Sequence, residues 1–244
     1  MMFNKTISFI LLFTSSFSAF AGLINAGFES GDLTNWQSSG GVSVTPNIAN
    51  FATQNYGSIG AVNTFQGDYM AQLSAGTVSA SSLASIMGVT ESTLEASNGN
   101  ADATDGSLIY QSTTATAGDT FTFNWNFVEE DYLPFDDWAF YGIQYENQAT
   151  ELFKFASLGS VGPDAGATIN GWEALTVNIT QTGNYTFYFG IVNVNDTNYD
   201  STLFIDGLTG TGSLSSDIQA VSEPTSLVVW AGALVGLMGF RRKR

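Results

Sequence analysis

The stretch TFTFNWNF at residues 120–127 decides the fold class of this chain. Phe121, Phe123, Trp125 and Phe127 alternate with small polar residues, the pattern of an antiparallel strand with one buried and one solvated face. Residues 184–192, NYTFYFGIV, repeat the alternation. We therefore predict an all-β fold, an antiparallel β-sandwich.

Other short stretches rich in apolar and β-branched residues extend this pattern, separated by clusters of Gly, Asn, Asp, Ser and Thr. Residues 79–96 differ, because their large apolar side chains group at helical spacing and predict a short helical segment. No internal repeat interrupts 22–208, so we expect one sandwich domain there and a spacer over 209–220. The further strand candidates are 41–45, 58–62, 69–73, 108–113, 139–145, 152–156, 175–179 and 202–208.

The N-terminus has the three parts of a secretory signal peptide. Lys5 supplies the positive charge, residues 7–13 (ISFILLF) the apolar core, and Ala19 and Ala21 an A-x-A cleavage site. We predict cleavage after Ala21, following export by the Sec machinery.

The C-terminus, residues 221–244, has the features of a second targeting signal. A short apolar helix over 227–240 would insert into a bilayer, and a basic end would stay in the cytoplasm, because Lys and Arg resist translocation. Fourteen residues at about 1.5 Å each span about 21 Å, short of a hydrocarbon core of about 30 Å. The length favours a transient, processed anchor over an ordinary single-pass anchor. The residues that carry this signal are Glu223, Pro224, Arg241, Arg242, Lys243 and Arg244.

The charge of the mature body, residues 22–222, is strongly negative. The whole chain has a formal charge of −16, but outside the two termini Lys154 alone faces twenty-one of the twenty-two carboxylates, which gives −20. Such a body repels nucleic acid and attracts divalent cations, although solubility outside the cell explains the same charge. The chain contains no Cys and no His, which excludes disulfides, imidazole or thiolate metal sites and the Ser-His-Asp triad.

The C-terminal pattern resembles the PEP-CTERM sorting signal, in which a Val-Pro-Glu-Pro element precedes an apolar helix and an Arg-rich end. Here the element reads Val221-Ser222-Glu223-Pro224, with Ser222 in place of the first proline. In that family a membrane enzyme, the exosortase, removes the tail in Gram-negative bacteria that make exopolysaccharide. The resemblance implies a precursor anchored in the inner membrane and a mature protein at the cell surface or in the extracellular matrix.

The start of the mature chain is similar to the opening strand of galactose-binding-like jelly rolls, which include many carbohydrate-binding modules. The similarity rests on the N-x-x-F-E-x-G spacing of residues 25–31, on Trp36, and on LFIDGL at 203–208, which resembles their last strand. In such folds the first and last strands are neighbours and often hold a structural calcium. The resemblance assigns that role to Glu29, Asp32 and Asp206, with the alternative that they cap strand ends.

Residues 129–138, EEDYLPFDDW, are the densest acidic stretch. Pro134 predicts a turn that brings Asp131 close to Asp136 or Asp137, a hypothetical second calcium site. The alternative is an acidic loop exposed to solvent.

Sugar binding needs flat aromatic side chains beside amides and carboxylates. Five aromatic residues lie in turn-like contexts beside Asn, Asp or Gly and are candidate platforms, with packing roles as the alternative: Trp36, Tyr132, Trp138, Trp172 and Tyr199.

The sequence therefore predicts an exported, non-catalytic sandwich that associates with exopolysaccharide in a biofilm or floc, stabilised by calcium. A surface protein that assembles with itself and binds no sugar is the first alternative. A glycosidase is the second, because carboxylate pairs such as Glu129 and Glu146 are available.

Overall fold

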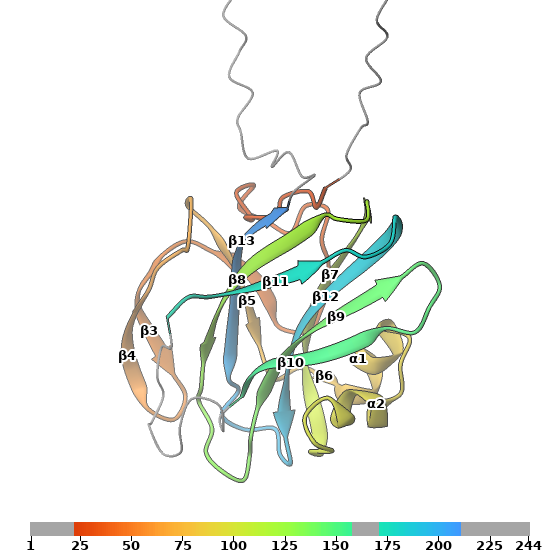
Figure 1. Cartoon of the computed structure of the whole chain (residues 1–244). Coiled ribbons are helices and arrows are strands. Elements are labelled where there is room, and N and C mark those ends of the chain that lie inside the picture. Colours follow the sequence, from red (N-terminus) through yellow and green to blue (C-terminus); the bar gives the residue numbers. More distant parts are fainter. Residues whose placement is uncertain (1–21, 158–170, 211–244) are drawn as a thin grey trace, which may run out of the picture.

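Two antiparallel sheets face each other in the computed structural model, which describes residues 22–157 and 171–210 (Figure 1). The first sheet has six strands in the order β1-β7-β12-β9-β10, with β6 paired to β7, and the second has five in the order β11-β8-β13-β5-β2. The predicted all-β sandwich is confirmed. In chain order the elements are β1 (Gln37–Ser39), β2 (Val42–Thr45), β3 (Ile48–Thr53), β4 (Gly57–Val62), β5 (Met70–Ser74), β6 (Val78–Ser79), α1 (Ala80–Ile86), α2 (Glu91–Ala96), β7 (Ala103–Ala115), β8 (Thr120–Val128), β9 (Trp138–Tyr145), β10 (Glu151–Ser157), β11 (Glu173–Asn178), β12 (Gly183–Val194) and β13 (Thr202–Gly210).

The core between the sheets is aromatic. On β8 the four predicted inward residues are all buried, and β12 contributes Tyr185, Phe187, Phe189 and Ile191 from the opposite sheet. The rings of Phe123 and Phe189 meet across the core, with centroids 4.5 Å apart. Alternation on β8 and β12 thus fixes which face of each sheet turns toward the other.

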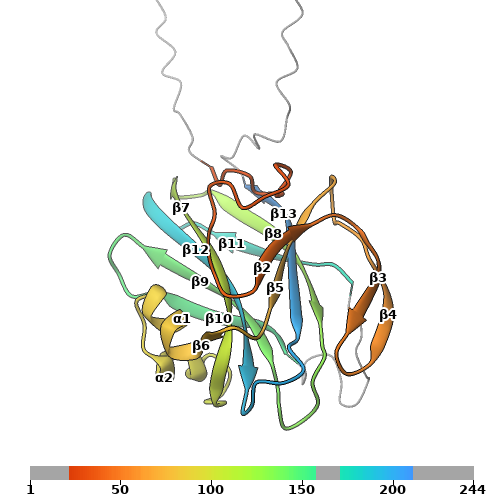
Figure 2. The ribbon, with the colours of Figure 1, turned by 180° about the vertical axis from the view of Figure 1, so that it is seen from behind.

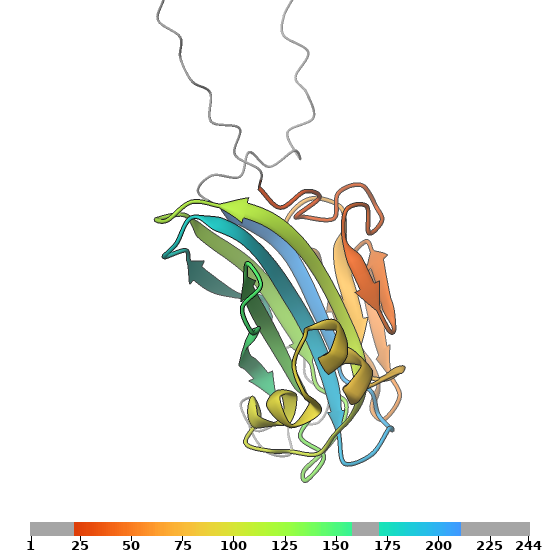
Figure 3. The same ribbon diagram turned by 90° about the vertical axis from the view of Figure 1, so that its right-hand side faces the viewer.

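The outer face of the first sheet is partly covered by the predicted helical segment, which forms α1 and α2 (Figure 3). Ser79 and Thr90 begin the two helices by accepting hydrogen bonds from the main-chain N–H of Ser82 and Thr93. Leu83, Met87 and Leu94 pack against β7 and β9 in a second apolar cluster.

The outer face of the second sheet is partly covered by the β3–β4 hairpin, which forms the right-hand edge of the molecule in Figure 2. Phe51 and Val62 pack there on Met70 and Phe204. The segment 48–53 was not among the predicted strands, whereas each of the ten predicted strands is present.

The opening segment, residues 25–36, is not the expected strand. Asn25, Phe28 and Asn35 have positive φ angles of 52°, 60° and 70°, which turn the chain back on itself and prevent an extended conformation. The segment nevertheless lies beside the last strand, where the main-chain N–H of Leu208 donates to the carbonyl of Ala26 at 3.3 Å. The first described residue and the end of β13 consequently lie at the same end of the sandwich (Figure 1).

Candidate functional site

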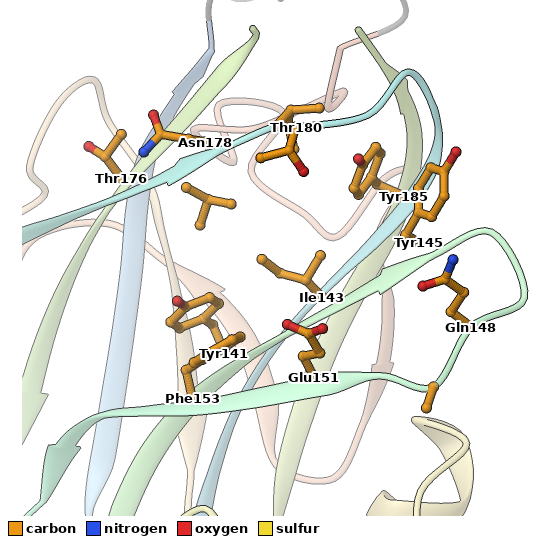
Figure 4. Close-up of a pocket in the computed structure, with 13 residues that line it drawn as sticks. Tyr141, Ile143, Tyr145, Gln148, Glu151, Phe153, Thr176, Asn178, Thr180 and Tyr185 are labelled. Atoms are coloured by element: carbon orange, nitrogen blue, oxygen red, sulfur yellow. The ribbon is translucent and has the colours of Figure 1, made fainter. Parts of the chain in front are cut away.

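A groove opens between the edge strand of each sheet, where β10 and β9 face β11 (Figure 4). Its volume is about 350 Å³, within the range of small-molecule sites. The floor is apolar and the rim is polar. The lining consists of Tyr141, Ile143, Tyr145, Gln148, Ala149, Glu151, Phe153, Thr176, Val177, Asn178, Ile179, Thr180 and Tyr185.

One wall of the groove is an aromatic surface on the first sheet. Tyr141 and Phe153 are direct cross-strand partners, and their rings stack with centroids 4.9 Å apart and planes 17° apart. Because β10 is an edge strand, Phe153 remains 39% exposed although its side chain points toward the groove. A flat apolar surface is thus available to a ligand.

The rim carries hydrogen-bonding groups on the side of β10, where the side chains of Glu151 and Gln148 are exposed. On β11 Val177 is buried, so the exposed Thr176 and Asn178 lie on the outer face of the strand, where the hydroxyl of Thr176 is 2.8 Å from that of Thr122. Burial, and then the negative charge of Glu151, raise the pKa of Tyr141 above its ordinary value. Tyr141 therefore stays a neutral hydroxyl beside a carboxylate at neutral pH.

Two further tyrosines of the groove are held in place by their hydroxyls. Tyr145 donates to the carbonyl of Thr182 at 3.2 Å, and Tyr185 donates to that of Gln181 at 2.8 Å. These bonds fix the end of the groove near the β11–β12 connection. Among the described lining residues Glu151 is the one carboxylate, whereas glycoside hydrolysis normally uses a pair.

Two of the predicted sugar platforms are wrong. Trp138 is 0% exposed beneath α1 and α2, and Trp36 is buried against Phe28 while its indole N–H donates to the carbonyl of Asn25. A ring without an exposed face cannot stack on a sugar. Their positions beside turns suggested exposure, but both turns are folded onto the core.

The other three platforms lie outside the groove. Trp172 is half-buried and donates to the carbonyl of Asn63 at 2.8 Å. Tyr132 is 46% exposed, and its ring lies 6.4 Å from that of Tyr199, so these two come together away from the groove lining. The groove aromatics Tyr141 and Phe153 were missed because they occupy regular strands. Alternation predicts that they face the other sheet, but it does not show that this sheet ends before it covers them.

The calcium site implied by the jelly-roll resemblance would involve Glu29, Asp32 and Asp206. Glu29 accepts hydrogen bonds from the main-chain N–H groups of Asp68 and Tyr69, and Asp206 accepts from those of Phe65 and Gln66. The loop 65–69 thus turns its main-chain N–H groups toward both carboxylates, whereas a calcium ion between them would need oxygen ligands from that loop. Asp32 instead accepts from Ser30 and Thr34, so the three residues as placed do not fit a shared calcium ion.

The acidic stretch 129–137 is not the solvated loop that was the alternative to a calcium site. Asp131 and Asp137 are buried, and so are Glu129 and Glu130, while Asp136 is half-buried. Two predicted targeting signals lie outside the described residues. The signal peptide with Ala19 and Ala21 falls in residues 1–21, and the C-terminal signal falls in residues 211–244. In the described part of the chain, neither helix is long and apolar enough to cross a membrane.

No protein-family model matches this sequence, and no curated protein matches it. Among solved structures, the chain is similar to TmCBM61 in complex with β-1,4-galactotriose, with 14% identity, a TM-score of 0.43, and coverage of 77% of this chain and 95% of that one. It is also similar to the CBM22-1 xylan-binding domain of Xyn10C from Paenibacillus barcinonensis (14% identity, TM-score 0.36, 76% and 90% covered). A third similar structure is the K1 cleaved adhesin domain of Lys-gingipain from Porphyromonas gingivalis (10%, 0.40, 77% and 96%). At these values the likeness carries no conclusion about what this chain binds.

Proposed function

We propose that this chain is an exported, non-catalytic protein whose β-sandwich binds polysaccharide in the groove between β10 and β11. The observation that carries the proposal is the stacked pair Tyr141 and Phe153, which presents an exposed apolar face. The C–H face of a pyranose stacks on such a surface, while its hydroxyls bond to flanking amides, hydroxyls and carboxylates. Gln148 and Glu151 supply those groups.

The cellular setting of the proposal rests on the two ends of the sequence. A signal peptide over 1–21 would send the chain across the inner membrane, and the PEP-CTERM-like tail over 221–244 would pass it to an exosortase. The mature protein would then stay at the cell surface or in the exopolysaccharide matrix of a biofilm or floc. The polysaccharide that a producing cell exports is accordingly the first ligand to test.

Replacing Phe153 with alanine is expected to weaken retention of the full chain on the producer's own exopolysaccharide by about two- to tenfold, since one stacking contact contributes about 0.5–1.5 kcal/mol. Retention is measured by affinity electrophoresis or on immobilised polysaccharide, with the protein in mild detergent. Tyr56→Ala is the matched control, because Tyr56 is a similarly exposed aromatic residue on the β3–β4 hairpin, away from the groove lining.

Equal loss in both variants, or none in Phe153→Ala, would contradict binding in the groove. If the wild-type chain is not retained and forms concentration-dependent oligomers, the self-assembling surface protein is favoured instead. Release of reducing sugar that disappears in Glu151→Gln would favour a glycosidase.

Deleting Arg241, Arg242, Lys243 and Arg244 is expected to block maturation, because the basic end holds the apolar segment in its orientation for the processing enzyme. The precursor should accumulate in the membrane fraction of the producing strain, as followed by immunoblot. Replacing Lys154, the one basic residue of the body, with glutamine is the control and should leave processing intact. Normal maturation without the four residues would argue against the sorting function.

A further inference from the structure

Strands of both sheets place polar side chains on the inward face at the end of the sandwich where β13 begins. On β12 the inward series Phe189 and Ile191 continues to Asn193. The partners of Ile191 are Ser107 on β7 and Ala139 on β9, and the residues two positions before them are Asp105 and Asp137. In the second sheet, Phe127 pairs with Leu203 near the end of β8, and Glu129, the buried residue just after β8, is next on the same side of the chain. Polar groups therefore occupy positions that would otherwise continue the aromatic core.

Hydrogen bonds connect these groups across the two sheets. Asp137 accepts from the main-chain N–H of Val194 and from that of Ser201, both at 3.2 Å, and thereby joins β12 to the start of β13. The side-chain amide of Asn193 donates to Asp105 and to Asp200, both at 3.0 Å. Glu129 joins these residues by its position after Phe127, and Asp131 by its charge, which acts on Asp137. We call the group the inner acidic cluster and define it as Asp105, Glu129, Asp131, Asp137, Asn193 and Asp200.

Three oxygen atoms of the cluster have no hydrogen-bond partner. They are Oε2 of Glu129, Oδ2 of Asp131 and Oδ1 of Asn193, in residues that are only 2%, 1% and 1% exposed. A buried acceptor without a donor costs about 1–3 kcal/mol, and more when it is charged. All three atoms are acceptors, so the group that satisfies them has to be a proton donor or a cation.

The charges around the cluster favour a cation. Asp131 acts electrostatically on Asp137, and Asp200 on Glu130, so negative charges are concentrated here. Lys154, the one basic residue of the described part, directs its ammonium group to Asn98 and Ser157. Burial raises the pKa of Asp131 to about 6 and that of Glu129 to about 7, as expected where ionised carboxylates have no counter-charge.

We propose that the inner acidic cluster binds one calcium ion through Glu129, Asp131 and Asn193. Calcium takes six to eight oxygen ligands in flexible geometry, and it accepts carboxylate, amide and main-chain oxygens together. Across 22–157 and 171–210, no three acidic side chains stand together as a ready-made metal centre. The ligand set is accordingly two carboxylates and one amide, completed by main-chain oxygens and water, with Asp137 holding the strands in place.

Calcium titration of the full chain in mild detergent at pH 7.5 tests this site without reference to sugar binding. We expect one ion per chain by isothermal titration calorimetry, and a rise in Tm of roughly 5–10 °C over the chelator-treated protein at about 100 times Kd. Asp131→Asn combined with Glu129→Gln should abolish the rise. The same double variant in chelator should be at least as stable as the wild type in chelator, because two buried charges are gone, which shows that the variant is folded.

The control is Glu91→Gln, an exposed carboxylate in the first turn of α2, which should keep the full calcium-dependent rise. Two results would overturn the proposal: no heat and no rise in Tm at millimolar calcium, or an undiminished rise in the double variant. The second result would mean that calcium binds at another site, and Asp206→Asn would then test the site near Glu29 and Asp206. If the wild-type chain binds calcium but is not retained on polysaccharide, the proposal of sugar binding in the groove is contradicted and the calcium site is not.

Discussion

Replacing Phe189 with alanine is expected to lower the free energy of unfolding by about 3–5 kcal/mol, the range for a fully buried aromatic residue. Phe189 is completely buried in the middle of β12, with its ring centroid 4.5 Å from that of Phe123 and 6.2 Å from that of Trp36. It therefore connects the two sheets and the opening segment. The variant leaves a cavity that none of these three elements can fill without moving the others.

Chemical denaturation in urea measures this loss, and a thermal scan should show Tm lowered by on the order of 10 °C. Leu133→Ala is the control, because Leu133 is exposed and its replacement should change the free energy of unfolding by less than about 0.5 kcal/mol. A loss below about 1 kcal/mol in the Phe189 variant would mean that the two sheets are not held together by this aromatic layer.

Without calcium, the free energy of unfolding is expected to fall by at least about 2 kcal/mol as the pH rises from about 4.5 to about 7, a value discounted for solvent screening from the full effect of these shifts. Burial is the main cause that raises the pKa of both Glu129 and Glu130 to about 7, while ordinary glutamate lies at 4.5. Between these values the unfolded chain releases protons that the folded chain keeps, so rising pH favours unfolding. Asp131 and Asp206, with pKa values raised to about 6, act in the same direction.

Urea denaturation in chelator at a series of pH values from about 4.5 to about 7.5 measures this slope. Glu130→Gln should flatten it, because the glutamine cannot ionise and its oxygen can still accept the main-chain N–H of Gln54. Glu91→Gln should leave the slope unchanged. Stability that is constant or rises with pH would show that these carboxylates are ionised at no cost in the folded chain.

The strands were predictable because each carries its own alternation. Phe121 to Phe127 and Tyr185 to Ile191 needed no partner to reveal their buried face, and the helical segment was visible in the spacing of Leu83 and Met87. The opening segment was not, because its turns depend on positive φ angles at Asn25 and Phe28, residues that also occur in strands. The hairpin strand β3 was missed because only Phe51 and Thr53 in it are buried.

The candidate sites were less predictable, since they depend on pairings between distant strands. The aromatic wall requires β9 and β10 in register, together with a second sheet that ends at β11 and leaves Phe153 exposed. The acidic stretch was visible, but the inward direction of Glu129 follows only from the register of β8 with β13. Asn193 and Asp105, 88 positions apart, meet only through the pairing of β12 with β7.

The two ends of the described body emerge together, while the inner acidic cluster lies at the start of β13, a strand of nine residues that ends at Gly210. A strand of that length spans about 30 Å. If the body is attached through the segment after Gly210, the cluster points away from the attachment, into the surrounding medium. The concentration of calcium outside the cell, rather than that at the membrane surface, would then set the stability of each displayed copy.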